Sequence, residues 1–331
     1  MTILWFTILA VVVSLVGVLL ARSSDRLGDA LRLEHSITGF LLLAAATSLP
    51  ELVISCQVAR TGALDMAAGS LLGSCLMNIL ILAAIDLSRR SRGTMLSGKA
   101  AAHGLSGLAS ILMAGVVAAA VLVPNAPSIG RVHIASVIIV ITYFAAFRLV
   151  FLDRKVSRMV DAAEPDPLFV PDDEEKPAVS RHLFPYLLAT AGIFALASPL
   201  ARSSTELSVL LGLSGTFFGA VFLALVTSLP EIVTTFEASR MDADDMAIGN
   251  ILGSNAFNLL ILFAVDLVSP APLFSTLGNV HAVAAIGIIC ATAIAAMGML
   301  YRVEKRWWTL EPDAVAVIAV SLFFFYLIYV G

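Results

Sequence analysis

Two separate stretches of this chain carry the same letters and decide how it folds. Residues 47–51 read TSLPE, and residues 227–231 read TSLPE again after an offset of 180 positions. Aligned at this offset without a gap, residues 39–87 and 219–267 are identical at 25 of 49 positions. Such internal similarity indicates a duplicated structural unit, so each motif should occupy an equivalent place in its own half of the molecule.

The composition assigns the chain to the membrane proteins. It is 59% hydrophobic and only 13% charged, far from the average of a soluble domain. Apolar stretches of about 20 residues recur along it, and each can cross a bilayer core of roughly 30 Å. The first stretch, residues 3–20, has no basic residue before it and is followed by charges, so a retained span is expected rather than a signal peptide. The three cysteines lie in apolar stretches and are expected to be reduced thiols.

Hydropathy and loop charge together predict ten membrane-spanning helices. The predicted spans are residues 3–21, 33–58, 65–87, 100–122, 132–152, 184–200, 208–238, 245–268, 278–301 and 312–330. Helices are expected because backbone polar groups must be satisfied within lipid, and no segment alternates in the way of a barrel strand. The predicted fold is therefore all-α, a multi-pass protein of the cell (plasma or inner) membrane.

The loop charges predict the orientation of these spans. With the N-terminus outside, the inside loops carry 17 Lys and Arg residues and the outside loops carry 3, which places both termini outside. Five spans per half is an odd number, so the second half enters the membrane inverted relative to the first. We expect a first repeat at residues 1–152, a cytoplasmic linker at 153–183 and a second repeat at 184–331. Inverted repeats are typical of secondary transporters, whose site lies near the midplane between the repeats.

The linker is the one substantial polar segment. It contains four prolines and the acidic run 172–175, a composition typical of a solvated, flexible connection. A calcium-sensing role stays open for it, although the linker has no EF-hand loop pattern.

Each copy of the motif places a proline inside an apolar span. Pro50 and Pro230 cannot donate a backbone hydrogen bond, and their rings clash with the carbonyl groups of Ala46 and Val226. Backbone broken in this way at membrane depth persists only where it is buried in protein or lines a cavity. The freed carbonyl oxygens are hard ligands, suited to Na⁺ or Ca²⁺.

The side chains around each proline form a set of oxygen ligands. Thr47 and Ser48 precede Glu51 by four and three residues, so all three share one helix face. In the next span Ser74 and Asn78 are four residues apart and also share a face. The second copy repeats this set at Thr227, Ser228, Glu231, Ser254 and Asn258. Together these residues form an all-oxygen site with two carboxylates, which suits Ca²⁺ and argues against zinc or copper.

A purely structural interpretation of the motif competes with this one. A proline kink in a span is common, and Ser or Thr can simply satisfy the backbone around it. An ionisable residue within a span is costly, however, and marks function. Its presence at matched positions of two inverted halves favours a functional role for Glu51 and Glu231.

Other polar positions admit more than one interpretation. Asp86 and Asp266 are repeated near span ends, where an anchor at the membrane boundary is as reasonable as a part in permeation. The five histidines form no cluster and are expected in solvated or interfacial positions. Two pairs of aligned but unlike residues could tune the pathway or have no role: Gln57 with Glu237, and Cys75 with Asn255.

At these motifs the chain resembles the sodium/calcium exchanger family of the cation/Ca²⁺ antiporter superfamily, in its prokaryotic type. That family carries two inverted α-repeats with G-T-S-L-P-E-like and G-S-x-x-x-N/D motifs. The resemblance implies four core ligands that hold Ca²⁺ or Na⁺ in turn: Glu51, Glu231, Asn78 and Asn258. It implies flanking ligands at Thr47, Ser48, Thr227, Ser228, Ser74 and Ser254. It further implies outer Na⁺ sites that use the backbone carbonyls of Ala44 and Ala224.

The chain departs from the family pattern at two kinds of position. Ala46 and Val226 replace the glycine that usually precedes the threonine, and Asn258 stands where many Na⁺-coupled relatives have aspartate. Two carboxylates neutralise one Ca²⁺, whereas three Na⁺ would leave a net positive charge. Relatives that exchange Ca²⁺ for protons also have asparagine at both positions, but their glutamate motif differs from TSLPE.

The expected function is Na⁺/Ca²⁺ exchange by alternating access, with inorganic cations and the lipid bilayer as partners. H⁺/Ca²⁺ antiport on the same fold and an uncoupled cation channel remain open as alternatives. An enzyme is not expected, because no His or Cys set is repeated and no nucleophile–base pair stands out. No cofactor, no nucleic acid and no obligatory protein partner are expected.

Overall fold

The computed structural model describes residues 2–88, 95, 103–161, 179–211, 225–300 and 312–330. Within these ranges nine helices are long and apolar enough to cross a membrane. The prediction of a helical protein with many membrane spans is therefore confirmed. The predicted span at residues 208–238 includes residues 212–224, which lie outside the described ranges.

The described part of the first half contains seven helical elements and a short hairpin. In chain order the helices are α1 Thr2–Ala30, α2 His35–Ile37, the π-helix η1 Thr38–Leu43, α3 Ala44–Arg60, α4 Leu64–Ser88, α5 Gly104–Leu122 and α6 Ile134–Asp161. Strands β1 Ser128–Ile129 and β2 Val132–His133 pair antiparallel between α5 and α6. The turn between them contains Gly130 with φ +66°, a conformation that glycine adopts without steric cost.

The second half follows the same order where it is described. Its elements are α7 Val179–Leu210, α9 Leu229–Arg240, α10 Asp244–Val268, the 3₁₀ turn η3 Leu273–Ser275, α11 Asn279–Leu300 and α12 Pro312–Val330. The acidic run 172–175 of the linker lies outside the described residues, whereas α6 and α7 extend into the two ends of the range 153–183.

Two predicted helix ends are wrong. Helix α1 continues to Ala30 and α7 to Leu210, so the segments expected as loops after residues 21 and 200 are helical. Hydropathy marks where an apolar run ends, but a helix continues beyond that point while its backbone hydrogen bonds and packing persist. The β1–β2 hairpin adds two short strands to a chain expected to be all-α, because a two-residue strand carries too few residues to show a periodic pattern.

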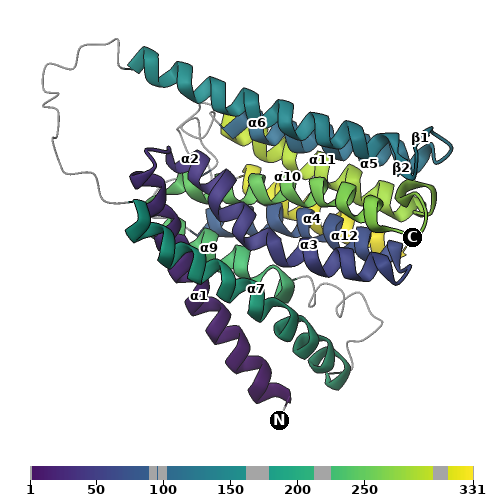
Figure 1. Ribbon diagram of the computed structural model, residues 1–331, viewed down its shortest axis with the longest axis horizontal. Coiled ribbons are helices and arrows are strands. Elements are labelled where there is room, and N and C mark those ends of the chain that lie inside the picture. Colours follow the sequence, from purple (N-terminus) through teal and green to yellow (C-terminus); the bar gives the residue numbers. More distant parts are fainter. Residues whose placement is uncertain are drawn as a thin grey trace, which may run out of the picture.

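The helices differ widely in how deeply they are buried. Figure 1 shows α1 and α7 side by side along one side of the bundle, tilted against the remaining helices. In their most apolar windows α4 and α10 are 72% and 67% buried, whereas α1 and α7 are only 22% and 17% buried. The helices α4 and α10, which carry Asn78 and Asn258, therefore form the core, and α1 and α7 expose most of their surface to lipid.

Close packing between the halves occurs at the glycines of α10. A Cβ atom added to Gly249 would lie 2.6 Å from the Ser36 carbonyl oxygen, and one added to Gly253 would lie 2.6 Å from that of Phe40. The backbone of η1 and its preceding turn therefore rests directly on α10, as small residues permit in membranes. The equivalent Gly73 has no atom within 4 Å of such a Cβ among the described residues. Its symmetry-related partner segment, near residue 220, lies outside them.

Candidate cation site

The first TSLPE motif lies within a continuous helix. Helix α3 runs through Pro50 without a break, after the wider turns of η1. The Thr47 hydroxyl donates to the carbonyl oxygens of Leu43 and Ala44, both at 3.2 Å. Glu51 follows on the same face and is partly exposed to a cavity.

The second motif has a different backbone despite its identical sequence. The helix is interrupted at Ser228, and α9 begins at Leu229 with Pro230 in its first turn. Proline is tolerated there because the first N–H groups of a helix have no partner within the helix. Glu231 lies in the same first turn, where the helix dipole favours a carboxylate.

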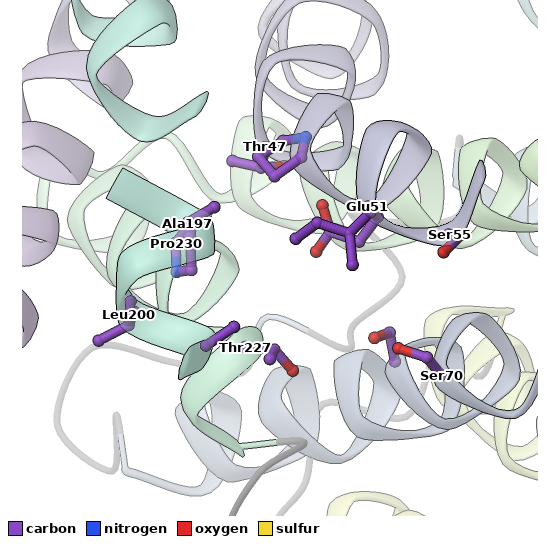
Figure 2. A pocket seen from close by; sticks show the side chains of 12 residues that line it. Thr47, Glu51, Ser55, Ser70, Ala197, Leu200, Thr227 and Pro230 are labelled. Carbon is purple, nitrogen blue, oxygen red and sulfur yellow. The ribbon is translucent and has the colours of Figure 1, made fainter. Parts of the chain in front are cut away.

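A small cavity of about 70 Å³ joins the two motifs (Figure 2). In Figure 2, Thr47, Glu51 and Ser55 border it from α3, Ser70 faces them from α4, and α7 closes one side. The lining residues are Thr47, Pro50, Glu51, Ile54, Ser55, Ser70, Ser74, Ala197, Leu200, Ala201, Thr227 and Pro230. The cavity therefore extends from the centre of the bundle along α3 toward its C-terminal end.

Several buried polar atoms around this cavity have no hydrogen-bond partner within the described part of the chain. They are Oγ of Ser48, Oε2 of Glu51, Oδ1 of Asn78, both carboxylate oxygens of Glu231, and both amide atoms of Asn258. Buried polar groups without partners are costly, and buried carboxylates most of all. Glu51 also interacts electrostatically with Glu231. A cation held by these oxygens would compensate both costs.

Hydrogen bonds across the repeats hold the two motifs together. The hydroxyl oxygens of Thr47 on α3 and Ser254 on α10 are 3.3 Å apart. The Asn78 amide on α4 donates to Oδ1 of Asn255 on α10, at 3.0 Å. The first contact joins the TSLPE motif of one half to the core helix of the other, and the second joins the core helices of the two halves.

The structure places the predicted ligands as follows. Thr47, Glu51, Ser74 and Thr227 line the cavity. Six more of the predicted ligands are buried polar residues: Ser48, Asn78, Ser228, Glu231, Ser254 and Asn258. Ala44 is buried, and its carbonyl oxygen already accepts from Thr47. Ala224 lies outside the described residues.

The cavity is found on one side of the site, whereas the equivalent positions on the other side are closed. The nearly buried Ser55 and the exposed Ser70 line the cavity, whereas their equivalents Thr235 and Asn250 are fully buried and do not line it. Asn250 Nδ2 donates to the hydroxyls of Thr235 at 2.9 Å and Thr234 at 3.0 Å. This arrangement leaves one path to the site open and the symmetry-related path sealed.

Helix α1 completes the seal. A Cβ added to Gly17 would lie 2.9 Å from Cγ1 of Val233, whereas the equivalent Ala197 of α7 borders the cavity. Beyond Gly17, Arg22 forms an ion pair with the buried Glu237 on α9. Sequence reasoning left Glu237 without an assigned role, because the partner lies 215 positions away and no spacing rule connects them.

Asp86 and Asp266 anchor the ends of α4 and α10. Asp266 accepts from the backbone N–H of His133 at 2.8 Å and of Leu273 at 2.6 Å, and from the Ser136 hydroxyl at 2.6 Å. Asp86 accepts from the backbone N–H of Met95 at 2.5 Å. The structure supports the anchoring interpretation of these residues.

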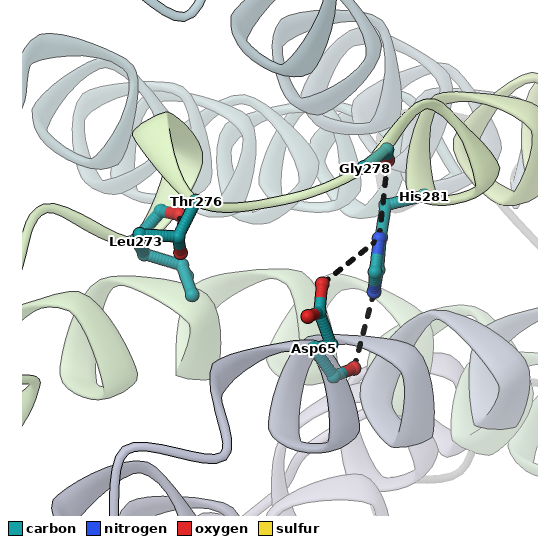
Figure 3. Close-up of polar contacts among 5 residues, drawn as sticks. All are labelled: Asp65, Leu273, Thr276, Gly278 and His281. Carbon is teal, nitrogen blue, oxygen red and sulfur yellow. Dashed lines mark hydrogen bonds and ion pairs between the residues drawn. The ribbon is translucent and has the colours of Figure 1, made fainter.

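Of the five histidines expected in solvated or interfacial positions, His103, His133 and His281 are buried and therefore not solvated. Each of the three lies at or next to the start of a helix. His281 on α11 contacts the carbonyl oxygen of Asp65 at 3.1 Å and its carboxylate at 3.8 Å (Figure 3). His103, which directly precedes α5, contacts the Asp245 carboxylate at 2.8 Å. Asp65 and Asp245 are repeat-related, so each half supplies a histidine to the helix start of the other. The two histidines are 178 rather than 180 positions apart, which hid this relationship in the ungapped alignment.

Comparisons with known proteins agree with this architecture. The family model described as "Sodium/calcium exchanger protein" matches residues 1–152 and 182–331. "Inner membrane protein YrbG" of Escherichia coli is 28% identical over 280 residues, covering 80% of this chain and 82% of that protein. "Putative antiporter CaxA" of Alkalimonas amylolytica is 27% identical, covering 79% and 81% respectively.

The same agreement extends to solved structures. The sodium-calcium exchanger NCX_Mj, in crystals soaked with 2.5 mM Na⁺ and 0.1 mM Sr²⁺, superposes with a TM-score of 0.69. The identity is 20%, and the match covers 98% of both chains. At this identity the likeness shows that the fold is shared.

Proposed function

Because this chain belongs to the sodium/calcium exchanger protein family, we propose that it is a secondary active antiporter that moves Ca²⁺ against Na⁺ by alternating access. One observation carries the proposal. Glu51 and Glu231 come from opposite repeats, and each keeps a buried carboxylate oxygen without a hydrogen-bond partner among the described residues. Glu51 lines the same cavity as Pro230, the residue beside Glu231. Carboxylate, amide and hydroxyl oxygens are the ligands that Ca²⁺ prefers.

Competition for these two glutamates couples the two ions. The carboxylates neutralise one Ca²⁺, and Na⁺ ions that occupy the same oxygens exclude it. Each ion shifts the equilibrium between the two access states only as far as it binds one state better than the other. The ligands that support this function are the core set Glu51, Glu231, Asn78 and Asn258, with Thr47, Ser48, Thr227, Ser228, Ser74, Ser254 and the carbonyls of Ala44 and Ala224 around them.

The proposed topology has ten spans with both termini outside, in the cell membrane. Its support is the charge distribution, with 17 Lys and Arg residues in the inside loops against 3 outside. In this orientation the cavity beside Ser55 faces outward, and the Arg22–Glu237 pair closes the inner side.

The test is Ca²⁺ flux into proteoliposomes that contain a Ca²⁺ dye, driven by an imposed Na⁺ gradient. Glu51→Gln and Glu231→Gln should each abolish the flux, because each removes half of the charge that neutralises Ca²⁺. Glu206→Gln is the matched control, since Glu206 is exposed on α7 away from the cavity. Near-normal flux in Glu51→Gln would refute the proposal.

The same fold supports a second candidate, H⁺/Ca²⁺ antiport. The observation that favours it is the presence of asparagine at both 78 and 258, which leaves two carboxylates to carry the counter-ion charge. Replacing the Na⁺ gradient with a pH gradient in the same liposomes separates the candidates. Flux that needs neither gradient would instead identify an uncoupled cation pathway.

A further inference from the structure

We propose that Asn255 is a positioning residue that turns the amide of Asn78 so that its carbonyl oxygen faces the cation. This inference rests on the proposed function and extends it to a residue outside the ligand set. Asn255 lies on α10, is fully buried, and contacts α4 of the other repeat.

The orientation follows from a chain of hydrogen bonds that starts at a group with a single possible role. The backbone carbonyl of Cys75 can only accept, and it lies 3.1 Å from the Asn255 amide nitrogen. The nitrogen of Asn255 is therefore committed to Cys75, and its Oδ1 must point the other way. That oxygen lies 3.0 Å from Nδ2 of Asn78. The Asn78 nitrogen is held in turn, and its Oδ1 is the atom left over.

The leftover oxygen is where a cation ligand is needed. Oδ1 of Asn78 is buried and has no hydrogen-bond partner among the described residues. An Asn side chain is nearly symmetric in shape, so without this relay the NH₂ group could occupy the same place. An NH₂ group turned toward a cation repels it, whereas a fixed carbonyl oxygen needs no reorientation when the ion arrives.

The other repeat lacks this device. The residue equivalent to Asn255 is Cys75, whose thiol lies 3.6 Å from the backbone carbonyl oxygen of Asn255 and is a much weaker donor and acceptor than an amide. The amide of Asn258 interacts with this thiol, but neither of its polar atoms meets the geometry of a hydrogen bond within the described ranges. The two asparagines of the site therefore differ: Asn78 is oriented before the cation binds, and Asn258 is oriented by the cation itself.

The experiment is a double-mutant cycle on Ca²⁺ binding, measured by calorimetry of the purified full-length protein in detergent and by the half-saturating Ca²⁺ of the liposome flux. Asn255→Ala should weaken Ca²⁺ binding roughly tenfold, because it removes both bonds that orient Asn78. In an Asn78→Asp background the two oxygens at position 78 are equivalent and need no orientation. Asn255→Ala should therefore change Ca²⁺ binding by less than about twofold there.

A merely structural role would give a different pattern. An equal loss in both backgrounds, or no loss in the unsubstituted background, overturns the positioning role while Ca²⁺ transport itself persists. Loss of Ca²⁺ binding in Asn78→Asp alone also overturns it, since an oxygen ligand at position 78 is its premise. Absence of any Ca²⁺ transport by the unsubstituted chain overturns the proposed function and this inference together.

Two further variants serve as a control and as a substitute for Asn255→Ala. Asn279→Ala removes an exposed amide at the start of α11 and should leave Ca²⁺ binding unchanged. If Asn255→Ala does not give folded protein, Asn255→Leu keeps the side-chain volume while removing the amide. Asn255→Leu must then weaken Ca²⁺ binding in the unsubstituted background and leave it nearly unchanged in the Asn78→Asp background.

Discussion

Arg22 on α1 and Glu237 on α9 form an ion pair, with 2.7 Å between Nη2 and Oε1. The Glu237 side chain is 4% exposed, whereas that of Arg22 is 53% exposed. The repeat-related positions are Arg202 and Gln57, and Gln57 carries no charge. The pair therefore ties a peripheral helix to the closed side of the site in one repeat only.

Neutralising this pair should expose the closed side. In Glu237→Gln, α1 loses an ionic contact with α9, so a state with α1 displaced becomes more populated. A cysteine introduced at Thr235, in a background without the three native cysteines, should then react several-fold faster with a water-soluble maleimide. Unchanged labelling at position 235 would contradict this role of the pair.

The matched control adds a charge at the equivalent place. Gln57→Glu supplies a carboxylate in the other repeat, next to the cavity rather than the seal. It should not speed labelling at position 235. Combined with Glu237→Gln, it should slow labelling of a cysteine at Ser55, which lines the cavity.

The two partners of the pair should differ in their effect on stability. Arg22→Gln leaves the buried Glu237 carboxylate with Arg240, at the longer distance of 3.6 Å. Glu237→Gln removes the buried charge itself. We expect Arg22→Gln to destabilise the protein by about 1–2 kcal/mol more than Glu237→Gln does. The difference is smaller than for a fully buried ion pair, because Arg22 is exposed to solvent. Thermal unfolding in detergent measures it, and equal melting temperatures would argue against an energetically significant pair.

The glycines of the two core helices should respond unequally to alanine. Gly253→Ala places a Cβ 2.6 Å from the Phe40 carbonyl oxygen, so the backbone must move. Overpacking of this kind costs about 1–3 kcal/mol. Gly69→Ala on α4 places a Cβ at the ordinary contact distance of 3.7 Å from Nε2 of His281 and should lower the melting temperature less.

Asp266 should prove structural rather than part of the ion path. Asp266→Ala leaves the N–H groups of His133 and Leu273 without their acceptor, which costs roughly 2–4 kcal/mol. The melting temperature should fall while the half-saturating Ca²⁺ concentration stays within about twofold, because such an anchor contributes to folding and not to ion binding. A weakened Ca²⁺ affinity at an unchanged melting temperature would instead indicate a permeation role.

Parts of the fold were predictable because their signals are local. The prediction for residues 312–330 coincides with α12, and that for 245–268 differs from α10 by one residue. The end of α1 was predicted nine residues too early, since charged residues continue a helix as readily as they end an apolar run. Of the predicted ligands, Thr47, Glu51, Ser74 and Thr227 border one cavity. The relay through Asn255 was not predicted, because it depends on a contact between residues 177 positions apart.

The sequence by itself determined that this is a duplicated membrane protein and which oxygen-bearing side chains each half contributes. Hydropathy and motif spacing describe only a few turns of one helix, so they lead to the same prediction for both copies. Only the tertiary structure decided that one TSLPE stays helical while the other breaks at Ser228. It also decided which side of the site is sealed and which way Asn78 faces. These differences arise because equivalent segments pack against unlike neighbours, and packing partners far apart in the chain leave no trace in local spacing.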